Sequence, residues 1–394
     1  MSRKVAVMTG TRADFGLLRP LLAELDSRPD ATLQLIVTGT HLSAEHGRTV
    51  GEITTAGFSV AAEVSIWSEV DSAHDSSLSA ALDTGNAVAE FSRTLSALQP
   101  DVVVVLGDRL EAFAMATAAV VLQIPVAHIH GGELTLGAMD DSLRHAITKL
   151  SYLHFATTDE HAARIVRMGE EPSRVYNFGA PLLDTLFVGG EPMHFIQRHE
   201  LEAKFGVVFG SRTALMTFHP AAFDEAPALE MFEELLAAIE AMHECHFIFT
   251  GTNNDIGSDQ VRERMAAFVA ANPDRVTFVE SFGQQGYLSA MHHVDLVVGN
   301  SSSTVLEAPL LGTPSVLVGN RQEGRPLAAS VIKAHADRSE LLQSMRKAIG
   351  PEFAAEFADK GTPFGEPGFA AKAAEVLALV TFATPLKKKF WEGQ

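Results

Sequence analysis

The chain has 394 residues, of which 46% are hydrophobic and 20% are charged, and its formal net charge at pH 7 is −19. This length predicts two domains, each with enough apolar material for a core of its own. An acidic chain repels the phosphates of nucleic acids and anionic membrane surfaces, which excludes both as general partners. An anionic small molecule must therefore be held by local clusters of arginine side chains or backbone amides.

The cysteine content and the lengths of the apolar runs indicate the cellular compartment. The single cysteine, Cys245, permits no internal disulfide, which is typical of the reducing cytosol. The apolar stretch before Gly10 is too short for a signal peptide, and no uncharged apolar run reaches the roughly 18 residues of a membrane span. We therefore expect a cytoplasmic protein with no membrane partner.

Apolar runs that end at a glycine or a polar turn recur along the chain and predict strands. They lie at residues 5–12, 33–41, 101–109 and 124–132, and again at 214–220, 246–254, 294–303 and 314–320. Near-continuous Val, Ile and Leu are typical of strands buried on both faces, as in parallel sheets. Residues 17–28 and 228–242 carry apolar stripes with helical spacing. Alternating strands and helices predict an α/β fold of two doubly wound parallel-sheet halves that face a central cleft.

The border between the halves is expected within residues 181–192, where Gly189, Gly190 and Pro192 interrupt the pattern. We accordingly expect an N-terminal domain over residues 1–184 and a C-terminal domain over 185–375. The tail, 376–394, is expected to pack back on the N-terminal domain. Ligands of open parallel sheets bind at the carboxyl ends of the strands, so the polar residues found there are the functional candidates.

The first strand ends in the sequence GTRADFG, residues 10–16. This is neither a G-x-G-x-x-G motif nor a P-loop, so the two commonest nucleotide motifs are absent from this turn. At the edge of a sheet, the planar guanidinium of Arg12 suits a diphosphate. The alternative is that Arg12 pairs with Asp14 or caps a helix, and the sequence alone leaves both interpretations open.

In the second half, Asn300, Ser301, Ser302 and Ser303 follow a strand and lead into a helical pattern. Backbone amides at a helix start, with three hydroxyls beside them, predict an anion site rather than simple capping. Glu307 further along could accept ribose hydroxyls or lie on a solvated helix face. Arg321 and Arg325 are further phosphate candidates, and His219 stands at another strand end, where a loop role is nearly as plausible.

The densest cluster joins Asp108 after a strand, His128 and His130 two residues apart, and Glu133 after two glycines. Because strand side chains alternate, the two histidines are expected to share one face. A helix then opens on Asp140 and Asp141, and its first turns also carry Arg144. Clustered carboxylates and imidazoles perturb one another's pKa values, which acid/base catalysis requires. Zinc or iron ligation is the alternative, but more carboxylates stand here than a closed metal site needs.

These segments occur together in a known family. The chain carries GTRADFGLL, GDRLEAFAMATAA, HIHGGELTLGAMDDSLRHAITKLS, GNSSSTVLEAPLLGTPSVLVGNRQEGRP and a closing KKKFW in this order. It resembles the hydrolysing UDP-N-acetylglucosamine 2-epimerases of the sialic and legionaminic acid pathways over nearly its whole length. The resemblance implies a GT-B fold, nucleotide binding by the C-terminal domain, no metal and no redox cofactor, and a homodimer or homotetramer.

The resemblance also implies a reaction. UDP-N-acetylglucosamine and water would give N-acetylmannosamine and UDP through a 2-acetamidoglycal, feeding sialic-acid-type sugar synthesis. The alternatives are a UDP- or GDP-linked 2,4-diacetamido-trideoxy sugar as substrate, a non-hydrolysing 2-epimerase, a glycosyltransferase and a nucleotide-sugar sensor without turnover.

On the resemblance, Asp108 and Asp140 match catalytic acids, whereas His130 stands where many relatives have a catalytic glutamate before the glycine pair. The second base is therefore either His130 or Glu133. From the clusters and the resemblance together, the catalytic candidates are Asp108, His130, Glu133, Asp140, Asp141 and Arg144. The nucleotide- or substrate-binding candidates are Arg12, His219, Asn300, Ser301, Ser302, Ser303, Glu307, Arg321 and Arg325.

Overall fold

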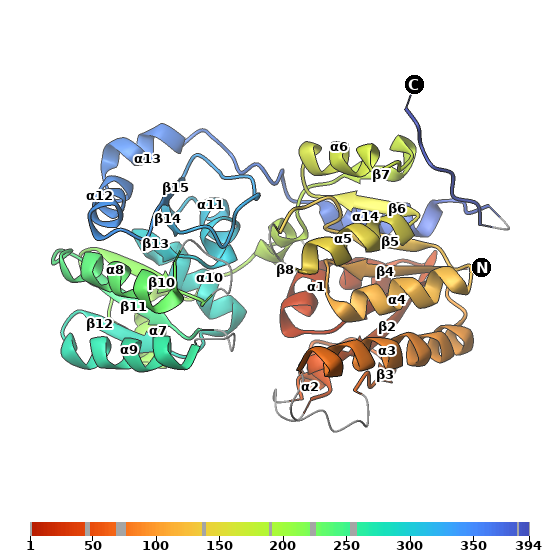
Figure 1. Ribbon diagram of the computed structural model, residues 1–394, viewed down its shortest axis with the longest axis horizontal. Helices are drawn as coiled ribbons and strands as arrows, with labels where there is room; N and C mark the ends of the chain where they lie inside the picture. The colour runs from red at the N-terminus through yellow and green to blue at the C-terminus, as the bar shows by residue number, and fades with distance from the viewer. Residues whose placement is uncertain are drawn as a thin grey trace. The chain divides into compact units, whose positions relative to one another are not determined.

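The computed structural model describes residues 2–43, 48–67, 76–135, 139–188, 191–220, 226–252, 258–383 and 386–393 (Figure 1). By its packing the chain divides into two units. Unit 1 comprises Met1–Leu134, Ala138–Pro192 and Phe364–Gln394, and the body of unit 2 is Met193–Pro363. The borders expected at residues 184 and 375 remain a proposal about independently folding domains.

Unit 1 is built on a parallel sheet, which has seven strands within the described residues, in the order β3-β2-β1-β4-β5-β6-β7. In that order the strands are β3 (Val60–Val64), β2 (Ala31–Thr38), β1 (Arg3–Thr9), β4 (Val102–Leu106), β5 (Val126–Ile129), β6 (Leu153–Ala156) and β7 (Val175–Asn177). The order reverses between β1 and β4, which is the point where ligands of such sheets bind. The short pair β8 (Phe187–Val188) and β9 (Glu191–Pro192) is antiparallel.

Helices cover both faces of this sheet, which explains why its central strand β4 is apolar and buried throughout. Val5 and Val7 of β1 pack with α1 and α14 on one face, whereas Ala6 and Met8 pack with α3 and α4 on the other. The helices of unit 1 are α1 (Arg12–Ser27), α2 (Val50–Thr55), α3 (Ser76–Leu98), α4 (Leu110–Val121), α5 (Met139–Leu150), α6 (Asp159–Arg167) and α14 (Phe369–Leu379), and its 3₁₀ turns are η1 (Gly39–His41), η2 (Pro172–Arg174) and η3 (Pro181–Leu186).

The last helix returns the chain to unit 1. The buried carboxylate of Asp184 accepts the N–H groups of Gly368 and Ala370, at 2.5 and 2.6 Å, where α14 begins. These donors lack partners inside the helix, so Asp184 supplies the cap that α14 needs. The apolar face of α14, with Phe369, Ala373 and Leu377, completes the core beneath α1.

Unit 2 repeats the plan with a parallel sheet that has six strands among the described residues, in the order β12-β11-β10-β13-β14-β15. These strands are β12 (Val276–Val279), β11 (His246–Thr250), β10 (Thr213–Thr217), β13 (Leu296–Gly299), β14 (Ser315–Val318) and β15 (Val331–Ala334). The helices are α7 (Arg198–Phe205), α8 (Ala228–Glu240), α9 (Ser258–Ala271), α10 (Gly283–His293), α11 (Glu307–Leu310), α12 (Arg338–Ala348) and α13 (Pro351–Phe357), with the 3₁₀ turn η4 (Ser302–Thr304). Its strand order reverses between β10 and β13.

The eight predicted strand runs all contain strands, and the two predicted helices are α1 and α8. The predicted fold class, two doubly wound parallel sheets, is therefore confirmed. The helical pattern expected after Asn300 consists of the 3₁₀ turn η4 followed by a single helical turn, α11. In the part of the chain that the structure describes, no helix combines the length and apolar character that crossing a membrane requires.

Candidate active site

The ends of two strands, β4 and β5, and helix α5 meet around Arg144 in unit 1. The chain leaves β4 through Gly107, whose φ of +76° is readily adopted only by glycine, and Asp108 follows. Arg144 comes from α5 and donates to the Asp108 carboxylate, to Glu133 Oε2 at 3.3 Å and to the His130 carbonyl at 3.2 Å. Its side chain is only 5% exposed. A buried guanidinium thus holds two catalytic candidates from different strand ends together.

Glu133 is engaged at both of its carboxylate oxygens. Oε1 accepts from His130 Nδ1 at 2.6 Å and from the Thr157 hydroxyl at 2.9 Å, and Oε2 accepts from Arg144. Because a carboxylate only accepts, Nδ1 of His130 carries a proton, and in the neutral ring Nε2 then carries the lone pair. His130 Nε2 is shielded from solvent and has no hydrogen-bond partner among the described residues. The His130 ring is therefore oriented by Glu133 and presents a lone pair that other side chains leave unused.

The expectation that His128 and His130 share one face of a strand is wrong. Strand β5 ends at Ile129, and His130 adopts a left-handed conformation with a φ of +66° at the start of the turn that holds the two glycines. His128 is fully buried, and its Nε2 donates to the Gly107 carbonyl at 2.7 Å. Burial lowers the pKa of His128 to about 3, so this ring is neutral and supports the turn before Asp108.

Asp140 and Asp141 stand on the first turn of α5, as predicted, and Arg144 of the same helix reaches the carboxylates of Asp108 and Glu133 on other elements. Partial burial, followed by the negative charge of Asp108, raises the pKa of Asp140. Asp141 lies 3.5 Å from His145 one turn along the same helix. The raised pKa favours Asp140 as a proton donor, whereas Asp141 faces a local partner.

Arg12 begins α1 and forms an ion pair with Glu52 of α2 at 2.8 Å. Both side chains are more than half exposed, so this pair is weak and the guanidinium is accessible. Asp14, the partner considered from the sequence, instead accepts the Gly10 N–H at 3.2 Å. The helix cap is Thr11, whose hydroxyl accepts the Asp14 N–H.

The sequence interpretation missed a second group of charged residues, beside the β1/β4 switch point. Glu111 accepts from Arg109 Nε at 2.8 Å and lies against Gly10, where a Cβ would come within 2.6 Å of Glu111 Oε1. Burial, outweighing the attraction of Arg109, raises the pKa of Asp14 to about 6, and the charge of Glu111 adds to the rise. The sequence signal for this group was the close spacing of Arg109 and Glu111 directly after a predicted strand.

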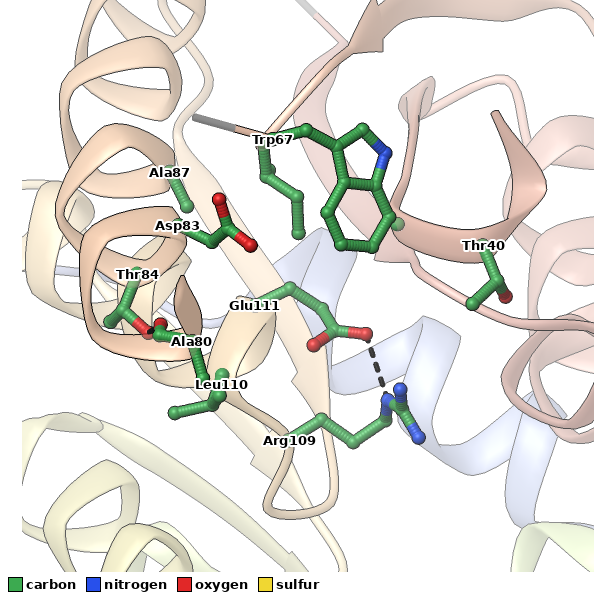
Figure 2. A pocket seen from close by; sticks show the side chains of 11 residues that line it. Thr40, Trp67, Ala80, Asp83, Thr84, Ala87, Arg109, Leu110 and Glu111 are labelled. Carbon is green, nitrogen blue, oxygen red and sulfur yellow. Dashed lines mark hydrogen bonds and ion pairs between the residues drawn. The ribbon is translucent and has the colours of Figure 1, made fainter. Parts of the chain in front are cut away.

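This group borders a cavity of about 170 Å³ (Figure 2). The cavity is lined by the indole of Trp67 and the Arg109–Glu111 pair, with Thr40 and Asp83 at its margins. In Figure 2 the guanidinium of Arg109 lies below the Trp67 ring, and the dashed line marks its bond to Glu111. The residues described contain no cluster of three or more His, Cys, Asp or Glu side chains arranged to hold a metal ion.

In unit 2, the side-chain amide of Asn300 joins the ends of β10 and β13. Its Oδ1 accepts the His219 N–H and its Nδ2 donates to the His219 carbonyl, both at 2.7 Å. The Asn300 carbonyl in turn accepts from Arg321 Nη1 at 3.3 Å and Gln322 Nε2 at 3.0 Å. Burial, and then the nearby charge of Arg321, lower the pKa of His219 to about 4. Asn300 thus positions a neutral His219 beside Arg321.

Hydroxyl groups fill the adjoining part of unit 2. The Tyr287 hydroxyl lies 2.8 Å from Ser303 Oγ and 3.1 Å from Thr217 Oγ1, and Ser303 donates to Ser301 Oγ at 3.0 Å. Ser302 is half-buried within η4. The sequence interpretation missed Tyr287, because it comes from α10, which strand β13 separates from the serines in the sequence.

Glu307 stands at the start of α11, one turn beyond these serines. Its Oε2 is shielded and lacks a hydrogen-bond partner among the described residues. Burial raises the pKa of Glu307, and the charge of Arg325 counters part of the rise. The alternative of a solvated helix face does not fit this environment, because an unpaired, shielded carboxylate oxygen is costly unless something binds it.

The family follows from comparison of the whole chain with known proteins. A family model described as UDP-N-acetylglucosamine 2-epimerase matches residues 23–378. The chain belongs to the UDP-N-acetylglucosamine 2-epimerase family. Among its relatives is the GDP/UDP-N,N'-diacetylbacillosamine 2-epimerase (hydrolyzing) of Campylobacter jejuni, which is 34% identical over 89% of this chain and 88% of the relative. The polysialic acid biosynthesis protein P7 of Escherichia coli is 33% identical over 92% of this chain and 90% of its own.

Solved structures of epimerases share the fold. A putative UDP-N-acetylglucosamine 2-epimerase from Listeria monocytogenes matches with a TM-score of 0.76 over 95% of both chains, at 17% identity. The Methanocaldococcus jannaschii enzyme, whose crystals contain UDP-GlcNAc and UDP, matches with a TM-score of 0.74 over 95% of this chain and 99% of its own, at 19% identity. These matches agree with the predicted GT-B class for this member of the epimerase family.

Proposed function

We propose that this epimerase-family enzyme is of the hydrolysing type and converts UDP-N-acetylglucosamine and water to N-acetylmannosamine and UDP. A base removes the C2 proton while the C1–O bond to UDP breaks, which gives a 2-acetamidoglycal. Water then adds its hydroxyl to C1, and a proton returns to C2 on the opposite face. The observation that carries the proposal is the joining of Asp108, Glu133 and His130 through the buried Arg144.

Inversion at C2 needs proton-transfer groups on two faces of the sugar ring, and unit 1 supplies several. Asp108 is fixed by its ion pair with Arg144, while partial burial and the charge of Asp108 raise the pKa of Asp140, the direction that favours a proton donor. Each such group typically contributes about 10²–10⁴ in rate. We assign the proton transfers to these residues together with the His130–Glu133 pair.

The geometry favours His130 over Glu133 as the second base. Both oxygens of Glu133 already accept hydrogen bonds, whereas His130 Nε2 is shielded and carries an unused lone pair. A carboxylate that accepts from Nδ1 fixes the tautomer and orientation of the ring and stabilises it once it is protonated. In this assignment His130 replaces the catalytic glutamate of the relatives, and Glu133 orients it.

We assign nucleotide binding to unit 2. Its Asn300–Ser303 turn, Arg321 and Arg325 supply donors for a diphosphate, and the shielded oxygen of Glu307 can accept ribose hydroxyls. His219 is kept neutral by burial and so donates or accepts a hydrogen bond rather than carrying a charge. Arg12, with its exposed pair to Glu52, is the phosphate candidate of unit 1.

Incubation with UDP-N-acetylglucosamine, followed by proton NMR of the products, tests the proposal. We expect UDP and free N-acetylmannosamine, with deuterium at C2 when the reaction is run in D₂O. UDP-N-acetylmannosamine as the product would show a non-hydrolysing epimerase. Retained nucleotide binding with no turnover would leave a sensor, and transfer of the sugar to an added acceptor would show a glycosyltransferase.

A second candidate substrate is a UDP- or GDP-linked 2,4-diacetamido-trideoxy sugar. It is favoured because the relatives from Campylobacter jejuni and Legionella pneumophila, 34% and 33% identical, are named hydrolysing epimerases of N,N'-diacetylbacillosamine nucleotides. Comparing kcat/KM for the two substrates decides between them. The homo-oligomeric state and the sialic-acid-type pathway stay predictions from the resemblance.

A further inference from the structure

The C-terminal tail packs on the end of α5 opposite to its catalytic candidates. The Trp391 N–H donates to the Gly169 carbonyl at 2.8 Å, and the ring of Phe390 covers Gly169 so closely that a Cβ at this position would collide with it. The Lys149 ammonium lies 4.8 Å from the centroid of the Phe390 ring. These contacts fix the tail where Lys388 can reach the helix.

The ammonium group of Lys388 closes the C-terminus of α5. It donates to the carbonyls of Lys149 and Ser151 at 2.5 and 2.6 Å, and it lies 3.5 Å from that of Thr148. The last carbonyls of a helix have no partner within the helix, and a cation there also opposes the negative end of the helix dipole. Lys388 therefore acts as the C-terminal cap of α5, although it lies far from this helix in the sequence.

The same ammonium neutralises a buried carboxylate. Glu170 is 2% exposed and accepts from Lys149 at 2.5 Å, from Lys388 at 2.7 Å and from His154 Nε2 at 3.0 Å. Burial alone would raise the pKa of Glu170, but these three hydrogen bonds lower it to about 2. Loss of Lys388 would thus leave a buried anion with one cation fewer, at the point where α5 ends.

Contacts along α5 carry this anchoring to the strand ends. Thr148 Oγ1 lies 3.2 Å from His128 Nδ1, and His128 Nε2 donates to the Gly107 carbonyl, directly before Asp108. Arg144, one turn earlier on α5, holds Asp108 and Glu133. A twelve-residue helix is nearly rigid, so a displacement at its C-terminal end moves Arg144 as well.

We propose that Lys388 is a positioning residue for the epimerase reaction, which holds α5 so that Arg144 and Asp140 keep their places relative to Asp108. The inference rests on the proposed function. It assigns the tail a part in turnover that does not require contact with the substrate.

Substitution Lys388→Met, which keeps the length of the side chain and removes its charge, tests the proposal in the full chain. We expect kcat for UDP release to fall by about 10²-fold, because a misplacement of about 1 Å costs this much. KM should stay within about twofold if unit 2 binds the nucleotide. Lys387→Met and Lys389→Met are matched controls, since both side chains are exposed, and they should keep wild-type kcat.

Two further measurements separate positioning from general loss of structure. Hydrogen exchange of Lys388→Met should be faster in α5 and unchanged in the strands of unit 2. Lys388→Arg, which keeps a cation and donors, and Lys388→Ala supplied with propylammonium should each recover part of kcat. A wild-type kcat in Lys388→Met would overturn the proposal. So would a loss of kcat that neither Lys388→Arg nor propylammonium added to Lys388→Ala recovers. If the wild type itself releases no UDP, the proposed function fails. Hydrogen exchange in α5 that is the same in Lys388→Met as in the wild type would then still refute the anchoring of α5 by Lys388.

Discussion

The carboxyl edges of the two sheets have the same architecture but different chemistry. In unit 1 the buried groups that follow β4 and β5 are charged and paired, as in the contacts of Arg144 with Asp108 and Glu133. In unit 2 the groups beside the β10/β13 switch point include the amide of Asn300 and the hydroxyls of Tyr287 and Ser303. One fold therefore presents paired carboxylates at one edge, and amide and hydroxyl dipoles beside arginine side chains at the other.

This difference matches the two halves of the proposed reaction. Proton transfer needs titratable groups whose pKa values are set by burial and by neighbouring charges, as for Asp140. Binding a diphosphate needs donors that are already oriented, and in the proposed assignment the Asn300–Ser303 turn, Arg321 and Arg325 supply them. We therefore expect substitutions in unit 1 to change turnover and substitutions in unit 2 to change nucleotide affinity.

The largest expected effect is that of Asp108→Asn. The amide keeps the shape of the side chain but cannot accept a proton, so kcat should fall by about 10³-fold while the affinity for UDP, measured by calorimetry, stays unchanged. Asp26→Asn, at an exposed position of α1, is the control and should keep wild-type kcat. Unchanged turnover in Asp108→Asn would remove this residue from the mechanism, and equal losses of affinity and turnover would contradict the division between units.

The effect of burying a charge in unit 1 can be tested at Asp14 by measuring the free energy of unfolding. Its pKa is about 6 in the folded chain against an ordinary value of 3.8 for aspartate, so the folded state binds the proton more tightly than the unfolded state. The contribution of this tighter proton binding to the free energy of unfolding is fully present below pH 3.8. It is lost as the pH rises through 6, at a cost of about 3 kcal/mol. Asp14→Asn should therefore be more stable than the wild type at pH 8, and the difference should vanish by pH 4.

Urea unfolding at pH 4, 6 and 8 measures this dependence. Asp26→Asn serves as the control, because its effect on the free energy of unfolding should not vary over the same range. A stability difference between Asp14→Asn and the wild type that is constant with pH would show that burial does not perturb this carboxyl group.

The pair His130 and Glu133 offers a finer test within unit 1. If His130 transfers the proton and Glu133 only orients it, His130→Gln should lower kcat by about 10²-fold and Glu133→Gln by about tenfold. The opposite order of losses would make Glu133 the base.

The strands were predictable because their signal is local. Val102–Val105 are buried on both faces of the sheet, and the run of four consecutive valines indicates this in the sequence. The position of His130 was not predictable from alternation, because the turn that holds the two glycines begins one residue earlier than the apolar run indicates. Element type thus follows from the pattern, but the residue at which a strand ends depends on tertiary contacts.

Partners distant in the sequence were the least predictable part of the site. Spacing placed Arg144 beside Asp140 and Asp141, yet its guanidinium reaches Asp108 and Glu133 on other elements. Likewise Lys388 showed only as part of a basic tail, and its role at α5 depends on the fold returning the chain to unit 1. The sequence identified the chemistry of the cluster, while the pairing within it required the sheet order.

The smallest expected effect belongs to Glu307 in unit 2. If its shielded oxygen accepts ribose hydroxyls, Glu307→Gln should weaken UDP binding by about tenfold, which is about 1.4 kcal/mol, and leave kcat at saturating substrate unchanged. The wild type should also prefer UDP to 2',3'-dideoxy-UDP by about tenfold, and this preference should disappear in the variant. Glu323→Gln, at an exposed position of the same unit, should retain it. A variant that binds UDP weakly yet still discriminates between the two ligands would place the lost contact elsewhere on the nucleotide and make Glu307 a support for Arg325 instead.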